Sequence, residues 1–186
     1  MTADETQSPA AEQDSARKAP RIELFAAIAL LALVLDVVSK AILVAKVPET
    51  RAPIRTLGGA VYVQQTRNSG AAFSLGTGFT VILTVVAVGV VVFIVRTAGR
   101  LRSIGWAIAL GMILGGALGN LTDRLFRSPG VGRGHVVDWI SLFGPDAKYW
   151  PIFNLADSAI VCGAILAAIL ALVGIDIDGR RARGRD

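Results

Sequence analysis

The chain has 186 residues, a formal net charge of +5 and 53% hydrophobic residues, and its mean hydropathy is +0.59. This composition excludes an ordinary soluble domain of this length. Four apolar stretches approach the ~20 residues that a helix needs to cross a bilayer. The sequence therefore predicts an all-α membrane protein with four transmembrane helices.

The first predicted span covers about residues 24–47 and follows a polar segment, residues 1–20, whose composition is typical of a disordered tail. A cleaved signal peptide is the alternative for this span. However, the apolar run continues past Asp36 and no small-x-small cleavage site follows it, so a retained span is favoured. Asp36 and Lys40 lie four residues apart within it, which predicts a salt bridge on one helix face.

The other predicted spans cover about residues 79–95, 104–121 and 153–175. The third closes on "GNLTDRL", which holds Asn120, Asp123 and Arg124, and the fourth begins on "FNLAD", which holds Asn154 and Asp157. An ionisable side chain inside a bilayer costs roughly 2.5–3.5 kcal/mol, so each of these acids indicates a functional site. Small residues repeat every four positions in both spans, which predicts close helix packing that brings the polar ends together.

Basic residues near the ends of the spans predict the orientation. They cluster before the first span, between the second and third spans, and in the tail of residues 177–186. Both termini are therefore expected in the cytoplasm, and all the intramembrane acids then lie near the outer face. This topology explains the basic charge, so no nucleic-acid partner is expected.

Two longer connections, about residues 48–78 and 122–152, are expected outside the membrane and to contain β structure. "AVYVQQT" predicts a short strand, and Asn68 in "NSG" falls at a turn. In the second connection, Asp138 is flanked by valines, Trp139 and Ile140. Two interpretations remain open: the solvated face of a strand, or a carboxylate in an apolar environment with a raised pKa.

The chemistry of the polar residues excludes several classes of site. With one histidine and one cysteine, a His/Cys zinc site is not expected. What remains is a group of carboxylates with carboxamides beside them. Two carboxylates that share a proton can activate water and protonate a leaving amine. Asp123 is the least suited of the outer acids, because Arg124 follows it and would keep it ionised and structurally tied. An ion or proton transporter and a non-catalytic assembly subunit are the alternative functions.

Five segments in order, "LDVVSK", "NSGAAFS", "GGALGNLTDRL", "GHVVDWI" and "FNLADSAI", resemble the motif regions of the lipoprotein signal peptidases, the type II signal peptidases of bacteria. The resemblance runs from about residue 24 to 175. It implies a multi-pass aspartyl endopeptidase of the bacterial plasma membrane, without cofactor or metal. Its implied substrates are prolipoproteins, cut just before a diacylglyceryl-modified cysteine, and membrane lipids are further partners. A monomer is expected.

The resemblance also implies roles for particular residues within a peptidase domain of residues 21–176. The catalytic pair would be Asp138 and Asp157. The residues that would shape the site or hold substrate are Asn68, Asn120, Asp123, Arg124, Asn154, Asp36 and Lys40. The segment "FRSPGVGR" between Asp123 and Asp138 is longer than in many family members and indicates a loop insertion.

Overall fold

The computed structural model describes residues 20–70 and 77–180. Four of its helices are long and apolar enough to cross a membrane, which confirms the predicted fold class. These helices are α2 (Ile22–Lys46), α3 (Thr77–Ala98), α4 (Ile104–Phe126) and α5 (Leu155–Leu172). Residues 1–19 of the predicted tail of residues 1–20, the last six residues and the part of "NSGAAFS" after Gly70 lie outside the described residues.

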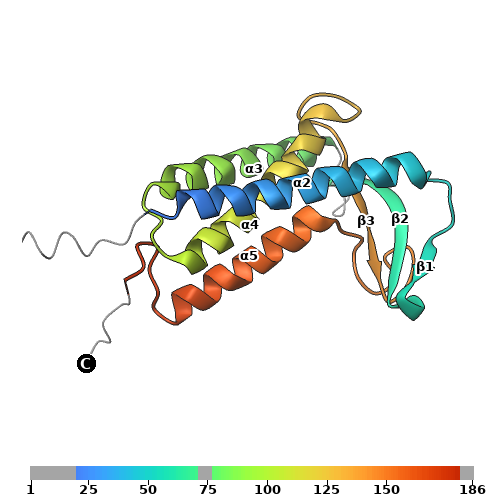
Figure 1. Cartoon of the computed structure of the whole chain (residues 1–186). Coiled ribbons are helices and arrows are strands. Elements are labelled where there is room, and N and C mark those ends of the chain that lie inside the picture. Colours follow the sequence, from blue (N-terminus) through green and yellow to red (C-terminus); the bar gives the residue numbers. More distant parts are fainter. Residues whose placement is uncertain (1–19, 71–76, 181–186) are drawn as a thin grey trace, which may run out of the picture.

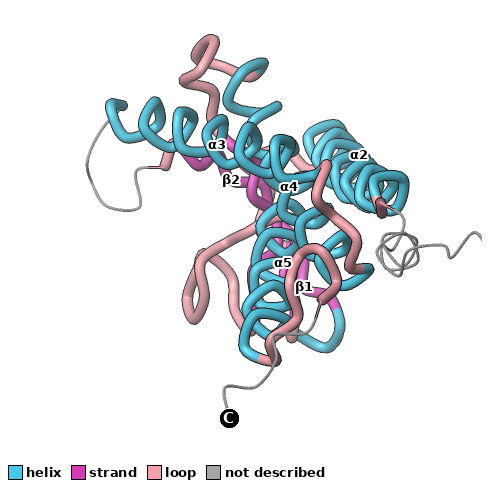
Figure 2. The backbone as a smooth tube through the Cα atoms, turned by 90° about the vertical axis from the view of Figure 1, so that its left-hand side faces the viewer, coloured by secondary structure: helices cyan, strands magenta, loops and turns pink. Residues whose placement is uncertain are grey.

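Helix α4 is the centre of the bundle. Each of the other three helices packs against it, and most of α4 is buried whereas the others expose most of their surface. Figures 1 and 2 show α2, α3 and α5 arranged around it. The described chain begins and ends at one end of the bundle, the termini end, and the small sheet covers the opposite end, the sheet end (Figure 1).

The small residues of α4 pack differently from the sequence prediction, in which the third and fourth spans meet through one pair of stripes. A Cβ at Gly111 or Gly119 would collide with α2, whereas Gly116 faces the backbone of Ala156 in α5. Gly163 of α5 in turn faces the backbone of Ala109 in α4. Close approach through small residues therefore occurs on two faces of α4, because this helix packs between α2 and α5.

The sheet has three antiparallel strands in the order β1 (Ile54–Thr56), β2 (Val61–Asn68) and β3 (Val136–Leu142). Strand β2 was predicted, although it extends through Asn68. Its pairing with β3 shifts by one residue between Val63 and Thr66, where a bulge inserts an extra residue. Side chains alternate between the two faces of a strand. The extra residue therefore decides which side chains of β2 after the bulge face the helix bundle.

The free edge of β3 is covered by the residue that leads into α5. Phe153 accepts hydrogen bonds from the backbone N–H groups of Trp139 and Ile140, at 2.9 and 2.8 Å, and donates one back to Ile140 at 3.0 Å. Asn154 and the first turn of α5 are thereby fixed beside Asp138. The sheet thus holds β3, which follows α4, against the start of α5.

Candidate active site

The two Asn-x-x-Asp pairs of the sequence have different structures. Asn120 and Asp123 lie within α4, because this helix continues five residues beyond the predicted span to Phe126. Asn154 lies before α5 and is its N-cap residue, so the prediction that Asn154 is part of the fourth span is wrong. The Asn154 side chain accepts from the Asp157 backbone N–H at 2.9 Å, and Asp157 Oδ2 accepts from the Asn154 backbone N–H at 3.2 Å. This reciprocal capping box fixes the position of the Asp157 carboxylate.

Asp138 is buried on β3, with a side chain that is 2% exposed. It is a strand residue, but the solvated interpretation is wrong. Strand β2 places Thr66 opposite Asp138, and Asn68, two residues further along, donates from Nδ2 to Asp138 Oδ2 at 2.8 Å. Asn154 donates from Nδ2 to the other oxygen, Oδ1, at 2.7 Å. Both carboxylate oxygens therefore accept an amide hydrogen.

Asn68 also forms the turn that the sequence predicted after β2. Its Oδ1 accepts the backbone N–H of Gly70 at 2.7 Å. This bond orients the amide so that its nitrogen points at Asp138. The amide oxygen of Asn68 thus stabilises the turn, and its amide nitrogen binds the Asp138 carboxylate.

Asn120 connects the second acid to a buried cation. Its Nδ2 donates to Asp157 Oδ1 at 2.7 Å. Its Oδ1 accepts from Lys40 Nζ and from Asn154 Nδ2, each at 3.1 Å. Since both donors hold the oxygen, the amide nitrogen must face Asp157. The orientation of Asn120 is therefore determined by its neighbours.

Lys40 lies in a buried group of charges behind the two acids. Its ammonium is 2.7 Å from Asp36 and 3.0 Å from Asp123, and all three side chains are almost fully buried. This confirms the predicted salt bridge between Asp36 and Lys40. Asp36 Oδ1 also accepts the backbone N–H of Ala156 at 3.0 Å, and so ties α2 to the first turn of α5.

The second cation of this group is Arg127, which the sequence analysis missed. Its guanidinium forms an ion pair with Asp123 one helical turn away. Arg124 interacts electrostatically with Asp123, as expected, but the direct ion pairs of Asp123 are with Lys40 and Arg127. Asp123 also accepts the backbone N–H of Val137 at 3.1 Å, which fastens β3 to α4 next to Asp138. Arg127 could have been found from the sequence, because it lies four residues after Asp123 and this spacing favours an ion pair on a helix.

Arg124 lies on the side of α4 that carries the site. Its Nη1 donates to the backbone oxygen of Asn120 at 3.4 Å. The guanidinium interacts electrostatically with the carboxylates of Asp157 and Asp138. Arg124 interacts most strongly with Asp157, then with Asp138 and then with Asp123, so it adds a positive charge to the two acids of the site.

Burial raises the pKa of Asp138 to about 6, and the negative charge of Asp157 acts in the same direction. The hydrogen bonds from Asn68 and Asn154 oppose this effect because they favour the ionised form. Asp138 is therefore the apolar-site carboxylate that the sequence analysis left as one of two possibilities.

A pocket of about 310 Å³ opens in front of Asp138. Its lining comes from the end of β2 and from the connection before α5, and it consists of Thr66, Arg67, Asn68, Ser69, Asp138, Ala147, Pro151 and Ile152. Gln64, at the bulge, supports one wall: it donates to Asp146 Oδ1 and accepts the Asp146 backbone N–H, each at 3.1 Å. The sequence analysis did not single out Gln64, since one polar residue in a strand carries no signal.

Within residues 20–70 and 77–180, no group of three or more His, Cys, Asp or Glu side chains is placed to hold a metal ion. The two acids of the site are instead surrounded by amide donors, Lys40 and Arg124. Such donors hold carboxylates in place and leave one face of Asp138 open to the pocket. The arrangement suits proton transfer by a pair of carboxylates.

Residues 28–173 match the model of the family Peptidase_A8, which is described as signal peptidase (SPase) II. The chain belongs to this family. Among its relatives, lipoprotein signal peptidases of Rhodococcus jostii and Streptomyces coelicolor are 51% and 52% identical, over 87% and 86% of this chain and 78% and 75% of theirs. The enzyme of Mycobacterium tuberculosis is 45% identical over 97% of this chain and 88% of its own.

Solved structures with a similar fold are those of bacterial membrane enzymes. Two structures of bacterial membrane enzymes, determined by the in meso method at 1.9 and 2.3 Å resolution, match with TM-scores of 0.72 and 0.69. Both are 27% identical, and the matches cover 84% of this chain and 97% and 92% of theirs. A multi-pass membrane peptidase is thus favoured over a transporter or an assembly subunit.

Proposed function

We propose that this chain is an aspartic endopeptidase that removes the signal peptide of prolipoproteins, with Asp138 and Asp157 as the catalytic pair. The observation that carries the proposal is the shared framework of the two acids, since Asn154 binds both of them. Membership of the signal peptidase II family supports the substrate class. Asp123, a further acid near the sheet end, is occupied by Lys40, Arg127 and a backbone N–H.

In the proposed reaction, a water molecule lies between the two carboxyl groups and the scissile peptide lies in the pocket beside Asp138. One carboxylate removes a proton from the water as its oxygen attacks the carbonyl carbon. The carbonyl oxygen becomes negative, and Arg124, whose charge interacts with both acids, would stabilise that charge. The protonated carboxyl of the pair then gives a proton to the leaving nitrogen as the C–N bond breaks. The pair is left with one proton for the next cycle.

The depth of the site fits a substrate anchored by lipid. Asp157 lies in the first turn of a membrane-length helix, and Asp138 lies in the sheet immediately beyond it. A peptide bond next to a lipid-bearing cysteine would be held at this level. Cleavage just before that cysteine would release the signal peptide and leave the lipid in the membrane.

The test uses the purified full-length chain and a prolipoprotein peptide with and without the diacylglyceryl group. Asp138→Asn and Asp157→Asn are expected to abolish cleavage, because each keeps the side-chain shape and loses the transferable proton. Asp123→Asn is the control and is expected to lower activity or expression without removing the chemistry. A dead Asp123→Asn enzyme beside a nearly normal Asp138→Asn enzyme would refute the choice of pair. Equal turnover of the bare peptide would refute the substrate, and chelators are expected to have no effect.

A further inference from the structure

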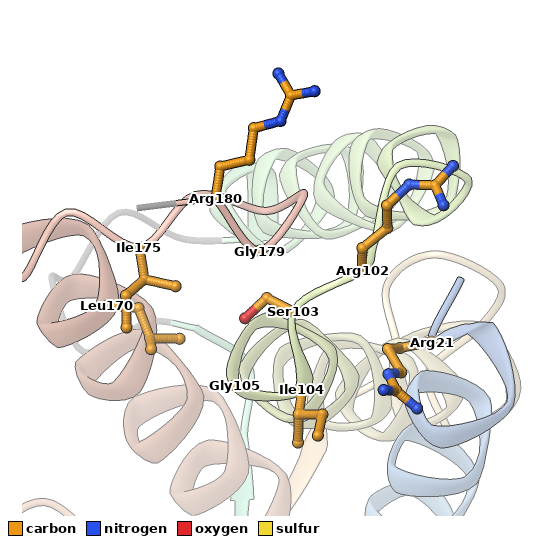
Figure 3. Close-up of a pocket in the computed structure, with 9 residues that line it drawn as sticks. All are labelled: Arg21, Arg102, Ser103, Ile104, Gly105, Leu170, Ile175, Gly179 and Arg180. Carbon is orange, nitrogen blue, oxygen red and sulfur yellow. The ribbon is translucent and has the colours of Figure 1, made fainter. Parts of the chain in front are cut away.

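A second cavity lies at the termini end of the bundle, far from the two acids. Its volume is about 610 Å³. Figure 3 shows Leu170 and Ile175 on one wall, Arg21 and Arg102 on the opposite side, and Ser103 between them. Arg180 stands at the rim. The cavity thus has an apolar wall and a cationic rim.

Three segments that are distant in sequence are tied together to build this cavity. The Arg21 backbone N–H donates to Leu101 O at 2.8 Å, which joins the start of α2 to the connection before α4. The N–H groups of Arg102 and Ser103 both donate to Ile177 O, at 3.0 and 3.1 Å. These bonds hold the segment after α5 against the bundle. The cavity is therefore a fixed part of the fold.

A side-chain bond strengthens this arrangement. Trp106 Nε1 donates to Ile175 O at 2.7 Å, and Ile177 packs against the buried core of the bundle. As a result, residues 175–180, which follow the last membrane-length helix, return to its end. Arg180 is carried to the same cavity as Arg21 and Arg102.

The local charges favour an anion. Ser103 is the N-cap of α4, so the positive end of a 23-residue helix dipole also faces this region. Nε of Arg21 is buried and finds no hydrogen-bond partner among the described residues. The described lining holds three arginines and no acid. Glu23, Asp176 and Asp178 lie in the same segments without lining the cavity, and Asp178 is 3.4 Å from Arg180 in a largely exposed pair that is weak in water.

We propose that this cavity binds the phosphate headgroup of an anionic phospholipid of the bilayer. The cavity lies where membrane-length helices end, which is the depth of lipid headgroups. Basic pockets between helices are known to accept such headgroups. The arginines would face the phosphate, and Ile104, Leu170 and Ile175 would contact the glycerol and the upper acyl chain. A free phosphate ion would leave this apolar wall without a partner.

The experiment reconstitutes the full-length protein into vesicles of phosphatidylcholine and phosphatidylglycerol in equal amounts. The protein is then extracted, and the lipid that stays bound is counted by native mass spectrometry. The wild type is expected to retain one phosphatidylglycerol in preference to phosphatidylcholine. Arg21→Gln/Arg180→Gln is expected to lower that retention by about tenfold or more, because two cationic contacts are lost.

The matched control is Arg96→Gln/Arg100→Gln. It removes the same charge at the same end of the bundle, from exposed residues that do not line the cavity, and it is expected to retain lipid like the wild type. An equal loss in this control, or equal retention of the two lipids, would overturn the proposal. So would displacement of the lipid by inorganic phosphate at equal concentration. If Arg21→Gln prevents folding, the exposed Arg180→Gln variant alone carries the test.

Discussion

The side-chain amide of Asn154 donates to Asp138 across 2.7 Å. The same residue caps α5, since its Oδ1 accepts the backbone N–H of Asp157. One side chain therefore starts a membrane-length helix and positions a carboxylate of the neighbouring strand. Its two ends can be separated by mutation, because serine is also a good N-cap but has no amide that could reach Asp138.

Replacement of Asn154 by serine and by alanine should separate these roles. Both variants lose the buried bonds of the Asn154 amide. Asn154→Ala also loses the cap, so it is expected to be less stable than Asn154→Ser by about 1 kcal/mol. Both should lose most of their activity, because Asp138 is then held by Asn68 alone. Thermal unfolding in detergent micelles and peptide cleavage are the measurements. A fully active Asn154→Ser enzyme would contradict the positioning role.

The rate should depend on pH through Asp138. As the pKa of Asp138 is about 6 and the negative charge of Asp157 helps to raise it, Asp138 holds the proton that the pair shares. We therefore expect kcat/KM to fall as the pH increases through about 6, where this proton is lost, and to rise toward a plateau from lower pH as the doubly protonated pair loses its first proton. Removal of the Asn154 amide withdraws a bond that favours the ionised form. The falling limb of any residual Asn154→Ser activity should therefore move to higher pH. A limb that stays in place would show that another group titrates.

The same pKa predicts a pH trend in stability. The carboxyl of Asp138 titrates near 3.8 when unfolded and near 6 when folded, so the folded protein binds more protons in this window. The contribution of Asp138 to the free energy of unfolding therefore falls as the pH rises, by about 3 kcal/mol in total. Asp138→Asn cannot titrate. The unfolding temperature of this variant, relative to the wild type, should rise between pH about 4 and about 7.

The membrane orientation is a separate prediction. Basic residues cluster at the termini end, including Arg96 in the last turn of α3 and Arg100 and Arg102 between α3 and α4. By the positive-inside rule this end should face the cytoplasm. Reporter fusions after Arg100 are expected to read cytoplasmic, and fusions near Gly58 and Gly132 are expected to read external. An external C-terminus would overturn this topology.

Lys40 should be essential for stability as well as for the site. Its ammonium compensates the negative charges of Asp36 and Asp123, which are buried away from water. Lys40→Met leaves buried carboxylates without this partner and is expected to cost about 3–5 kcal/mol. Lys40→Met/Asp36→Leu should recover part of the loss, because one uncompensated charge is removed with its partner. If the two single effects simply add in this cycle, the residues do not form a coupled pair.

The features predictable from the sequence were those with a strong local signal. Four apolar stretches fixed the helices to within a few residues, and the i,i+4 spacing of Asp36 and Lys40 predicted their salt bridge. The resemblance of five segments to the family's motif regions indicated the two candidate acids. In the structure, both of these acids bind Asn154.

The details that orient the site depend on contacts across the chain. The bulge between Val63 and Thr66 follows from pairing with β3 and from the bonds of Gln64 to Asp146, which no local pattern encodes. The same Asn-x-x-Asp spacing is helical at Asn120 and a capping box at Asn154. The strand contact of Phe153, immediately before Asn154, holds the chain in an extended conformation up to the capping box that starts α5.

Gly119 provides a test of how closely α4 and α2 must approach. A Cβ at this position would lie 2.5 Å from Oδ2 of Asp36 and 3.0 Å from its Cγ. Gly119→Ala should therefore displace the Asp36 carboxylate, weaken its bonds to Lys40 and to the first turn of α5, and cost about 1–3 kcal/mol of stability. Because that turn carries Asp157, peptide cleavage should fall as well.

The matched control for Gly119→Ala is Gly89→Ala in α3. A Cβ at Gly89 meets no atom of the described residues within 4 Å, and alanine favours a helix over glycine by about 0.5–1 kcal/mol. Gly89→Ala should thus leave activity unchanged and raise the unfolding temperature slightly, while Gly119→Ala lowers both. If Gly119→Ala were as stable and active as the control, Asp36 would be free to move without consequence, and the buried charges behind Asn120 would not hold the site in place.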